Sequence, residues 1–567
     1  MERPKNIVII GAGYVASPLR MNWIAFIDQS FLLSIGGLAF AIKLKQRLPH
    51  AQFTIYEKAS EVGGTWRDNI YPGAASDIGI HFYSLSSDLK SDWSFTQADQ
   101  AEILAYWIDL AHKYHLYPHI IFNTRVIGAR WDSDAQCYHI DAENVNTSER
   151  IPTSAEILVS ANGILEIPHI PKIAGLGMFK GDLFHSARWK DVPLKGRKVG
   201  VIGNGSSAMQ FMPHIAEQPD VEVTQFCRTP KWILPPVRQP YSTRWKWCLA
   251  HVPLLLQLYR FVWFMKSGGL YMIFSNALFR WLVTKRTTQY MLSEAPERYH
   301  DRMIPKFPVG CKRLLFDNFG YLESLHKPNV RLVYDGLTEI VEDGVLMKGG
   351  QKIDLDVIIL ATGFVADEYA IPIRGLNGQT IQEYYDTYGA PRAYLGTTLP
   401  GFPNFYMLSG PNTATGHSSV LYSEELQTDY CLALIAPVLA NKAKSFEVTP
   451  EATDSYNERI QARLSRSVFV HCNSWYRKGG DGIISSIFPG SQTRFWWWLR
   501  APVWCHYRVV TPKSHVHDSY VIGGDVWKQQ QKQGQRFGTT VGVIMYGGAL
   551  VLGLGLALAG FYLPGGL

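Results

Sequence analysis

The chain has 567 residues, enough for several domains with large cores. Apolar residues make up 47% and charged residues 18%, which indicates a folded protein with some membrane character. Lys and Arg number 55 against 48 Asp and Glu, so the net charge of +7 is a small excess that does not suggest a nucleic-acid partner.

An interrupted glycine motif lies near the N-terminus. Residues 7–10 form an apolar strand, and Gly11 and Gly13 begin a G-x-G-x-x-G pattern, but position 16 is Ala16. If residues 15–35 are removed, Gly37 becomes the third glycine and an amphipathic helix follows it. We therefore hypothesise that residues 15–35 derive from a retained intron or a gene-model error.

The next strand, at residues 53–58, carries an acidic residue near its end. A carboxylate at this place of a βαβ unit accepts a hydrogen bond from a ribose hydroxyl. Glu57 occupies the position, and no basic residue takes its place. The first unit is therefore predicted to bind FAD.

A second and uninterrupted fingerprint follows the strand at residues 199–202. Its glycines allow a tight turn and close approach of the backbone to a pyrophosphate at a helix N-terminus. At the end of the next strand, Arg228 and Thr229 stand where NAD-binding units have a carboxylate, and Lys231 is close by. Because Arg suits a ribose 2′-phosphate, we predict NADPH. The expected NADP contacts here are Gly203, Asn204, Gly205, Ser206, Ser207, Ala208, Met209, Gln210, Arg228 and Thr229.

The seven cysteines contain no C-x-x-C pair. A disulfide framework, a zinc site and a flavin disulfide reductase are therefore disfavoured, and no metal site is expected. A reducing compartment is the better prediction.

Two apolar stretches raise the question of a membrane. Residues 241–291 are apolar and helical in pattern but are interrupted by Arg260, Lys266 and Arg280, which favours an amphipathic insertion on the body or on a membrane surface over a spanning pair. Residues 541–563 lack charged side chains and as a helix would be about 35 Å long, enough to cross a bilayer core of roughly 30 Å. Lys528, Lys532 and Arg536 precede this run, so the body is expected in the cytoplasm, with the endoplasmic reticulum as the expected membrane.

A third motif lies between the two units. Phe179, Gly181, His185 and Trp189 in "FKGDLFHSARW" match the F-x-G-x-x-x-H-x-x-x-W fingerprint of Baeyer–Villiger monooxygenases, and "GGTW", "NIYPG", "ATGF" and "LSGPN" also match. The chain therefore resembles that family, within the class B flavin-containing monooxygenases, over about residues 1–500 apart from 15–35. It looks like a fungal enzyme of secondary metabolism.

The resemblance implies roles for particular residues. Asp77 and the pair Lys312 and Arg313 match active-site positions, with Arg313 holding the reactive oxygen anion of the flavin and the nicotinamide. Asp77 would orient Arg313, and His185 would couple domain motion, while Trp475 lies in a segment matching a substrate-side loop but could equally pack in the core. The implied FAD contacts, besides the first glycines and Glu57, are Thr65, Trp66, Arg67, Asp68, Asp77, Tyr83 and Val126, and the implied further NADP contacts are Ala75, Ser76 and Asp77.

The expected architecture is α/β, with two Rossmann-like dinucleotide-binding domains, a helical insertion and a C-terminal transmembrane helix. The FAD-binding domain would comprise residues 1–155 and 356–535, the NADPH-binding domain 156–235 and 301–355, the insertion 236–300 and the membrane anchor 536–567. The substrate is expected to be a small-molecule ketone of a polyketide or terpenoid pathway, oxidised with O2.

Two other functions remain open. The chain could be a flavin monooxygenase that oxidises heteroatoms or hydroxylates carbon. It could also be an inactive, membrane-tethered remnant, because the first glycine motif is interrupted.

Overall fold

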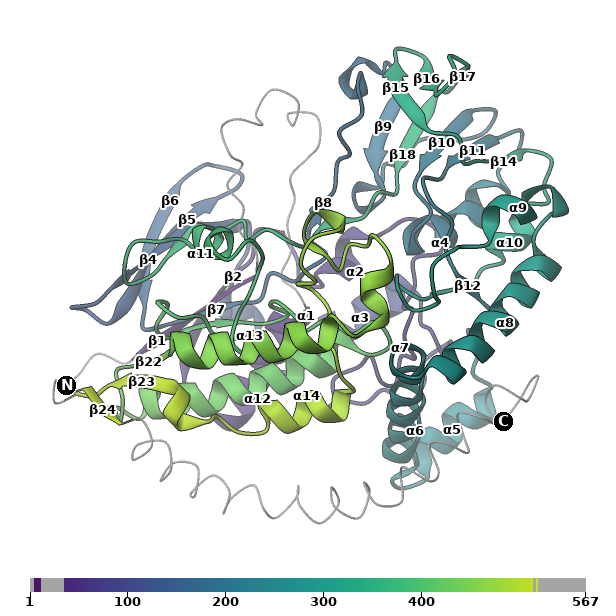
Figure 1. The fold of residues 1–567 in the computed structure, drawn as a ribbon. Helices are drawn as coiled ribbons and strands as arrows, with labels where there is room; N and C mark the ends of the chain where they lie inside the picture. Colours follow the sequence, from purple (N-terminus) through teal and green to yellow (C-terminus); the bar gives the residue numbers. More distant parts are fainter. Residues whose placement is uncertain (1–4, 12–34, 513–515, 519–567) are drawn as a thin grey trace.

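Two parallel five-stranded sheets organise the computed structural model, which describes residues 5–11, 35–512 and 516–518 (Figure 1). The first sheet has the order β21-β7-β1-β2-β3, with each neighbouring pair parallel. Numbered along the chain, this is the 3-2-1-4-5 order of a doubly wound nucleotide-binding sheet. Its strands are β1 (Asn6–Ile10), β2 (Gln52–Tyr56), β3 (Ile120–Ile121), β7 (Ile157–Ser160) and β21 (Phe405–Met407).

Helices cover one face of this sheet and a smaller sheet lies on the other side (Figure 1). Helix α1 (Ile35–Arg47) is buried from Ile35 to Leu44 and packs on α12 (Val420–Leu439). The other helices of this half are α3 (Gln100–Lys113), α11 (Ile381–Thr387), α13 (Pro450–Leu464) and α14 (Gln492–Leu499). The small sheet contains β20 (Ile373–Arg374), β4 (Thr124–Asp132), β5 (Cys137–Asn144) and β6 (Arg150–Ala155).

The second parallel sheet has the order β14-β11-β10-β18-β9, which matches the first sheet in four strands but takes its edge strand β9 from before β10 in the chain. Its strands are β9 (Asp182–His185), β10 (Lys198–Ile202), β11 (Glu222–Phe226), β14 (Val330–Val333) and β18 (Val357–Leu360). Helix α4 (Ser206–Ile215) follows β10, as the second fingerprint predicts. One face is covered by an antiparallel sheet of β15 (Leu337–Val341), β16 (Gly344–Met347) and β17 (Lys352–Asp354), which shares the apolar cluster of Ile358 and Leu360. The domain boundaries stay a prediction.

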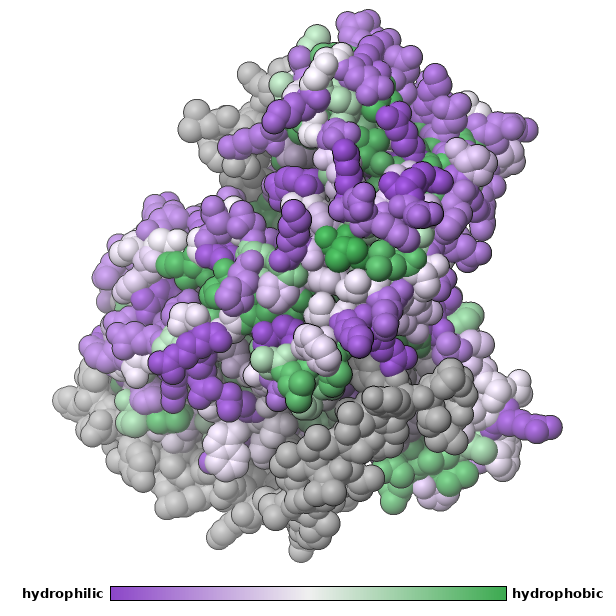
Figure 2. Space-filling model, turned by 45° about the vertical axis from the view of Figure 1, so that its right-hand side comes forward, coloured by the Kyte–Doolittle hydropathy of each residue, from purple (hydrophilic) through white to green (hydrophobic). Residues whose placement is uncertain are grey.

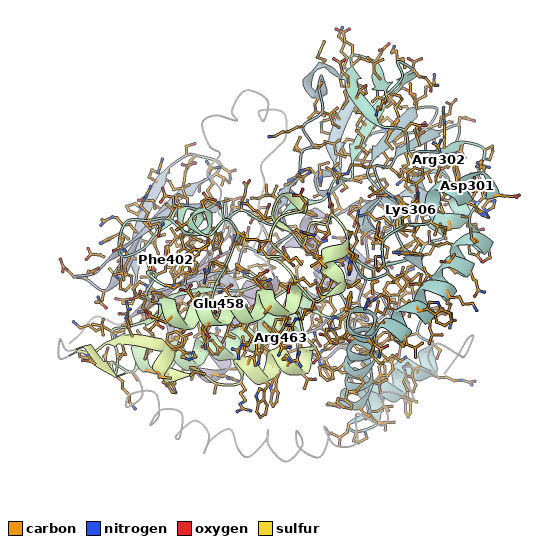
Figure 3. The ribbon with its side chains drawn as sticks, in the orientation of Figure 1. Asp301, Arg302, Lys306, Phe402, Glu458 and Arg463 are labelled. Carbon is orange, nitrogen blue, oxygen red and sulfur yellow. A yellow bond between two sulfur atoms is a disulfide. The ribbon has the colours of Figure 1, made fainter. Side chains whose placement is uncertain are left out.

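Shorter elements connect these layers. They are α2 (Thr65–Asp68), α10 (Tyr321–Ser324), β8 (Ile167–Pro168) paired with β19 (Phe364–Val365), β12 (Ile233–Leu234) paired with β13 (Leu315–Phe316), and the sheet of β22 (Ser445–Val448), β23 (Tyr507–Val510) and β24 (Val516–Asp518). Figure 3 shows how the side chains divide between the two halves, with Glu458 and Arg463 on α13 and with Asp301, Arg302 and Lys306 beside the second sheet.

The apolar stretch after residue 241 forms the predicted helical insertion, comprising α5 (Thr243–His251), α6 (Leu255–Leu270), α7 (Met272–Ser275), α8 (Ala277–Glu294) and α9 (His300–Met303). Within the described part of the chain, no single helix has the length and apolarity of a membrane span. Helix α5 combined with the stretch Leu255–Ser275 reaches both, but the two are bent by 111°.

One expectation about cysteine is wrong. Cys311 and Cys472, separated by 161 residues, form a disulfide with their Cα atoms 6.1 Å apart. The two cysteines are too far apart in the sequence to form a short motif such as C-x-x-C, so their spacing could not predict the bond. The bond joins the segment of Lys312 and Arg313 to the segment of Trp475.

Two other predictions fall outside the described residues. Residues 15–34 of the suspected insertion are not among them, although its last residue, Ile35, begins α1. The C-terminal apolar run at 541–563 also lies outside.

Candidate functional site

A charge-assisted fork between Arg313 and Asp77 lies at the centre of the site. The guanidinium of Arg313 donates from Nη2 and Nε to Oδ2 of Asp77 at 2.6 and 3.2 Å. The two residues are 236 positions apart in the chain. The Asp77 side chain is 19% exposed and that of Arg313 42%, so the aspartate is the more enclosed partner and the guanidinium is accessible to a ligand.

Helix α4 holds Asp77 from its N-terminal end. The Ser206 hydroxyl donates to Oδ2 of Asp77 at 3.0 Å, and the Gln210 amide donates to Ala75 O at 3.0 Å and lies 3.4 Å from Oδ1 of Asp77. A helix N-terminus stabilises a nearby carboxylate through its unpaired N–H groups. Asp77 and Ser206 also line a small, partly open pocket. The fingerprint helix of the second unit is thus coupled directly to the predicted catalytic pair.

The charge of Arg313 is fixed by its neighbours. Burial alone would lower the pKa of Arg313, but the Asp77 carboxylate, followed by Tyr476 and Tyr83, more than offsets it, and the pKa lies above its usual value. A guanidinium that stays charged at every working pH is suited to stabilise an anion that develops during a reaction.

The glycine turn after β10 has the geometry of a phosphate cradle. Gly203 has a φ of +115°, and a Cβ there would lie 2.3 Å from Ala361 O, so only glycine fits. A Cβ on Gly205, in contrast, would meet no atom within 4 Å. The backbone before α4 is therefore open to close approach by a ligand, as a pyrophosphate requires.

Basic side chains gather around the end of β11. The amine of Lys312 donates to Thr229 Oγ1 at 3.1 Å, and the Asn204 amide donates to Thr229 O at 2.9 Å. Burial, then Lys312 and then Arg228, lowers the pKa of Lys231 to about 8, and burial followed by Arg228 also lowers the pKa of Lys312. Cations that lower one another's pKa form a site that an anion would stabilise. These residues fit the 2′-phosphate of NADPH.

The first unit fits a nucleotide without that phosphate. Glu57 is fully buried at the end of β2, where its Oε1 accepts a hydrogen bond from Ala59 N at 2.6 Å. At the carboxyl ends of β7 and β21 there is a partly open hollow, lined in part by Gly163, Tyr369 and Ser409. Ligands of doubly wound sheets bind in such a crevice. The buried carboxylate fits the ribose of FAD, and the hollow lies at the edge of the sheet where such a ligand binds.

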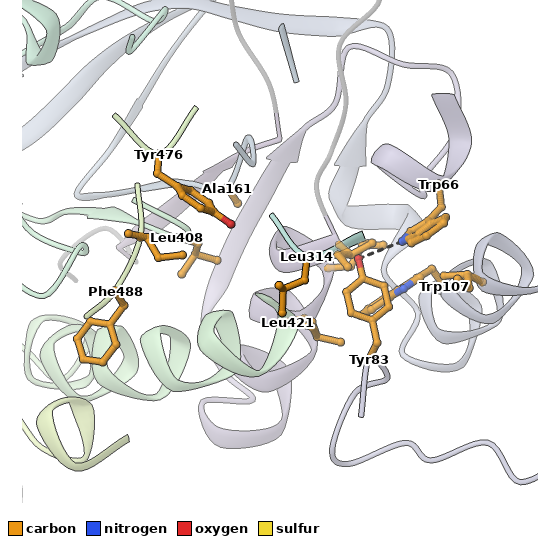
Figure 4. Close-up of a cluster of buried hydrophobic side chains, with 14 of the residues drawn as sticks. Trp66, Tyr83, Trp107, Ala161, Leu314, Leu408, Leu421, Tyr476 and Phe488 are labelled. Carbon is orange, nitrogen blue, oxygen red and sulfur yellow. Dashed lines mark hydrogen bonds between the residues drawn. The ribbon is translucent and has the colours of Figure 1, made fainter. Parts of the chain in front are cut away.

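Aromatic side chains lie between the first nucleotide-binding unit, which contains Glu57, and the Arg313–Asp77 pair. Trp66 Nε1 donates to the Tyr83 hydroxyl at 3.2 Å, and Figure 4 shows this bond beside the buried Leu314 and Leu421. Burial, offset in part by the bond from Trp66, raises the pKa of Tyr83 well above its usual value, so the hydroxyl stays protonated. The same figure places Tyr476 across the cluster from Tyr83.

The remaining predicted residues are distributed around these features. Arg67 pairs with Asp68 at 3.1 Å, and Asp68 also pairs with Arg188 at 3.0 Å. The charges of α2 therefore face the third motif, which contains Arg188. Val126 is fully buried in β4, and the Ser76 hydroxyl donates to Ile78 O. Residues that lie in or next to the cradle are Ser207, Ala208 and Met209 in α4, and Thr65 begins α2. Gly37 lies in the first turn of α1, and Gly13 lies outside the described residues.

The third motif is a packing unit at the edge of the second sheet. His185 is fully buried beside Leu360 and its Nδ1 accepts from Ala187 N at 3.1 Å. Burial, then Arg188, lowers the pKa of His185 to about 3, so the imidazole is neutral. Trp189 packs against Tyr71, Phe184 and Phe211. A buried neutral His is unsuited to general acid catalysis, and the coupling role of His185 stays a prediction.

Several residues near the site were not identified from the sequence. Tyr476 is buried and acts electrostatically on Arg313, and Trp475 packs against it with ring centroids 4.8 Å apart. Glu424 of α12 is buried against α1, and a Cβ on Gly36 would lie 2.6 Å from its carboxyl carbon. Burial raises the pKa of Glu424 to about 7. No local motif marks either residue, because their neighbours come from distant segments.

Comparison with known proteins agrees with this geometry. The model of the family described as flavin-binding monooxygenase-like matches residues 49–373. The FAD-binding monooxygenase ktnD of Aspergillus niger is 35% identical over 81% of this chain and 78% of its own length. A Baeyer–Villiger monooxygenase of Pseudomonas aeruginosa is 34% identical over 81% of this chain and 86% of its own.

Solved structures give the same result. A steroid monooxygenase bound to NADP is 27% identical, with a TM-score of 0.72 over 89% of this chain and 99% of its own. The enzyme OTEMO in complex with FAD and NADP is 25% identical, with a TM-score of 0.74 over 88% of this chain and 98% of its own. The predicted family, enzyme class and cofactor pair are confirmed, and the chain belongs to the flavin-binding monooxygenase-like family.

Proposed function

We propose that this protein is an FAD- and NADPH-dependent Baeyer–Villiger monooxygenase that converts a ketone of a secondary-metabolite pathway into an ester or lactone. One oxygen atom of O2 enters the bond beside the carbonyl carbon, the other leaves as water, and NADPH is oxidised. The observation that carries the proposal is the Arg313–Asp77 fork at the N-terminus of α4.

The chain's own residues would hold the reactants in place. The cradle at Gly203 and Gly205 would bind the NADPH pyrophosphate, and Glu57 would bind the FAD ribose. FAD supplies the oxygen-activating chemistry when it is bound. Arg313 would then stabilise the anionic oxygen that attacks the ketone, with Asp77 keeping the guanidinium in position.

A fixed cation at the reaction centre favours ketone oxidation over the alternatives. An anionic oxygen is nucleophilic and attacks a carbonyl carbon, whereas oxidation of a thioether needs a protonated, electrophilic oxygen. Secondary metabolism is supported by the similarity to fungal relatives such as ktnD.

The purified holoenzyme distinguishes these functions. We expect a yellow protein that oxidises cyclic and steroid ketones with NADPH and gives esters or lactones by mass spectrometry. Oxidation of thioethers alone would contradict the Baeyer–Villiger proposal, and a colourless protein that cannot be reconstituted with FAD would identify an inactive remnant.

Replacing Arg313 tests the fork. Arg313→Lys keeps the charge but loses the two-pronged bond to Asp77, so we expect kcat for the ketone to fall by roughly 100-fold. Asp77→Asn removes the orienting charge and should cost about tenfold. Arg302→Lys, an exposed arginine paired with Asp335, is the matched control and should leave kcat unchanged. Full activity of Arg313→Lys would contradict the role of the fork.

Lys231 makes NADPH binding depend on pH. Its pKa is about 8, so it carries its charge at pH 7 and loses it as the pH rises above 8. We therefore expect the KM for NADPH to be constant near pH 7 and to rise above pH 8, while the KM for NADH, which lacks the 2′-phosphate, stays flat. Lys231→Met should raise the KM for NADPH roughly tenfold at pH 7 and remove the pH dependence. Parallel pH profiles for the two coenzymes would contradict this assignment.

We also propose that residues 541–563 form a C-terminal membrane anchor with the catalytic body on the cytoplasmic side, in the endoplasmic reticulum. The support is the uncharged run and the cations Lys528, Lys532 and Arg536 before it. The full chain should stay in the membrane pellet during alkaline carbonate extraction, and a chain ending at residue 535 should be released. Release of both forms would contradict the anchor.

A further inference from the structure

The helical insertion exposes large apolar side chains at the turn between α5 and α6. They are Trp247 (59% exposed), Val252 (43%), Leu254 (75%) and Leu258 (56%), which we call the α5–α6 tip. Leu254 is the most exposed large apolar residue of the described chain. In Figure 1 α5 and α6 project from the lower edge of the molecule, and Figure 2 shows apolar side chains gathered in that region.

The opposite face of α6 is firmly attached to the body. Arg260 donates to His81 O at 2.7 Å and to Ser84 O at 2.8 Å, and Phe264 packs edge-on against Phe82. The ring of Trp263 fills the space beside Gly79. The inner face of α6 is therefore held by contacts with the body of the protein, and these contacts fix the helix that carries the tip.

The backbone at the tip is strained at Leu254, its most exposed residue. Leu254 has a φ of +62°, a left-handed conformation that is unfavourable for a leucine, and it comes directly before the first residue of α6. Strain of this kind persists where the surroundings or a function demand it. Here the strained residue is a leucine that is 75% exposed.

Helices α5 and α6 carry cations but no acidic residue of their own, and the exposed acid of the body that faces them is Asp92, which interacts electrostatically with Lys246 and is paired with Lys90. Between residues 223 and 293 the sequence contains no Asp or Glu. The helices carry exposed or half-exposed cations at Arg244, Lys246, Lys266, Lys285 and Arg286. The positive excess of the whole chain is small, so this concentration is a local property of the insertion.

We propose that the α5–α6 tip docks on an anionic membrane surface, with Trp247, Leu254 and Leu258 entering the boundary between headgroups and acyl chains. Apolar and Trp side chains beside Lys and Arg are the composition that binds such an interface. A second copy of this chain would bring like charges together, and charge complementarity therefore favours lipid. The surface is separate from residues 541–563 and from the site of Arg313.

Hydrogen exchange on the full-length holoenzyme tests this proposal. The protein is mixed with vesicles of phosphatidylcholine alone or with about one third phosphatidylserine. We expect amide exchange in residues 247–258 to slow at least threefold with the anionic vesicles only. The loop of Leu376, an apolar residue that is 41% exposed and far along the chain, is the control and should not change. Unchanged exchange at the tip would overturn the proposal.

Variants separate the tip from the C-terminal run. Arg244→Glu combined with Lys246→Glu should weaken protection by anionic vesicles roughly 30-fold in lipid concentration. Leu254→Ser combined with Leu258→Ser should also abolish it, whereas Leu376→Ser should not. Flavin absorbance checks that each variant is folded.

The hydrogen-exchange readout is local to the tip, so it is independent of whether residues 541–563 anchor the chain. Protection by soluble polyglutamate but not by vesicles would overturn the lipid proposal in favour of an acidic protein.

Discussion

The arrangement of the site depends on one partly exposed ion pair, between Asp77 and Arg313. Asp77 follows the loop of the first unit, Arg313 follows the helical insertion, and Ser206 begins the fingerprint helix of the second unit. Because all three meet at one carboxylate, a shift of either sheet relative to the other would break a charge-assisted bond, and such bonds are roughly twice as strong as neutral ones. The position of Arg313 therefore depends on the relative placement of the two sheets, as the role proposed for its guanidinium requires.

The disulfide and the aromatic wall extend this constraint. Cys311 lies two residues before Arg313, and its partner Cys472 precedes Trp475 and Tyr476. Tyr476 in turn helps to keep the pKa of Arg313 high. The segment of Trp475 and Tyr476 is thus linked covalently to the segment of Arg313 and acts electrostatically on its guanidinium.

Local sequence patterns sufficed for the parts of the fold built by neighbours in the chain. The glycines after residue 202 predicted a strand, a tight turn and a helix, because Gly203 must adopt a positive φ there. Local patterns did not predict the disulfide, Tyr476 or Glu424. Each of these depends on contacts between segments more than a hundred residues apart, or on burial that no local periodicity encodes. Asp77 and Arg313 were found only through the resemblance, since their pairing spans 236 positions.

The elements on both sides of the interrupted glycine motif are formed and packed as in a dinucleotide-binding unit, although the sequence pattern itself is incomplete. Strand β1 ends at Ile10, Gly11 N donates to Tyr56 O, and α1 is buried from its first residue, Ile35, against the same sheet. The Glu424 carboxyl lies over Gly36, where it occupies the space that a Cβ would take. The strand and helix that a dinucleotide turn must connect are therefore both present, and Ile35, at the end of the suspected insertion, already belongs to the helix. The features on either side support a nucleotide site at this turn, and the intron hypothesis for residues 15–35 stays a prediction.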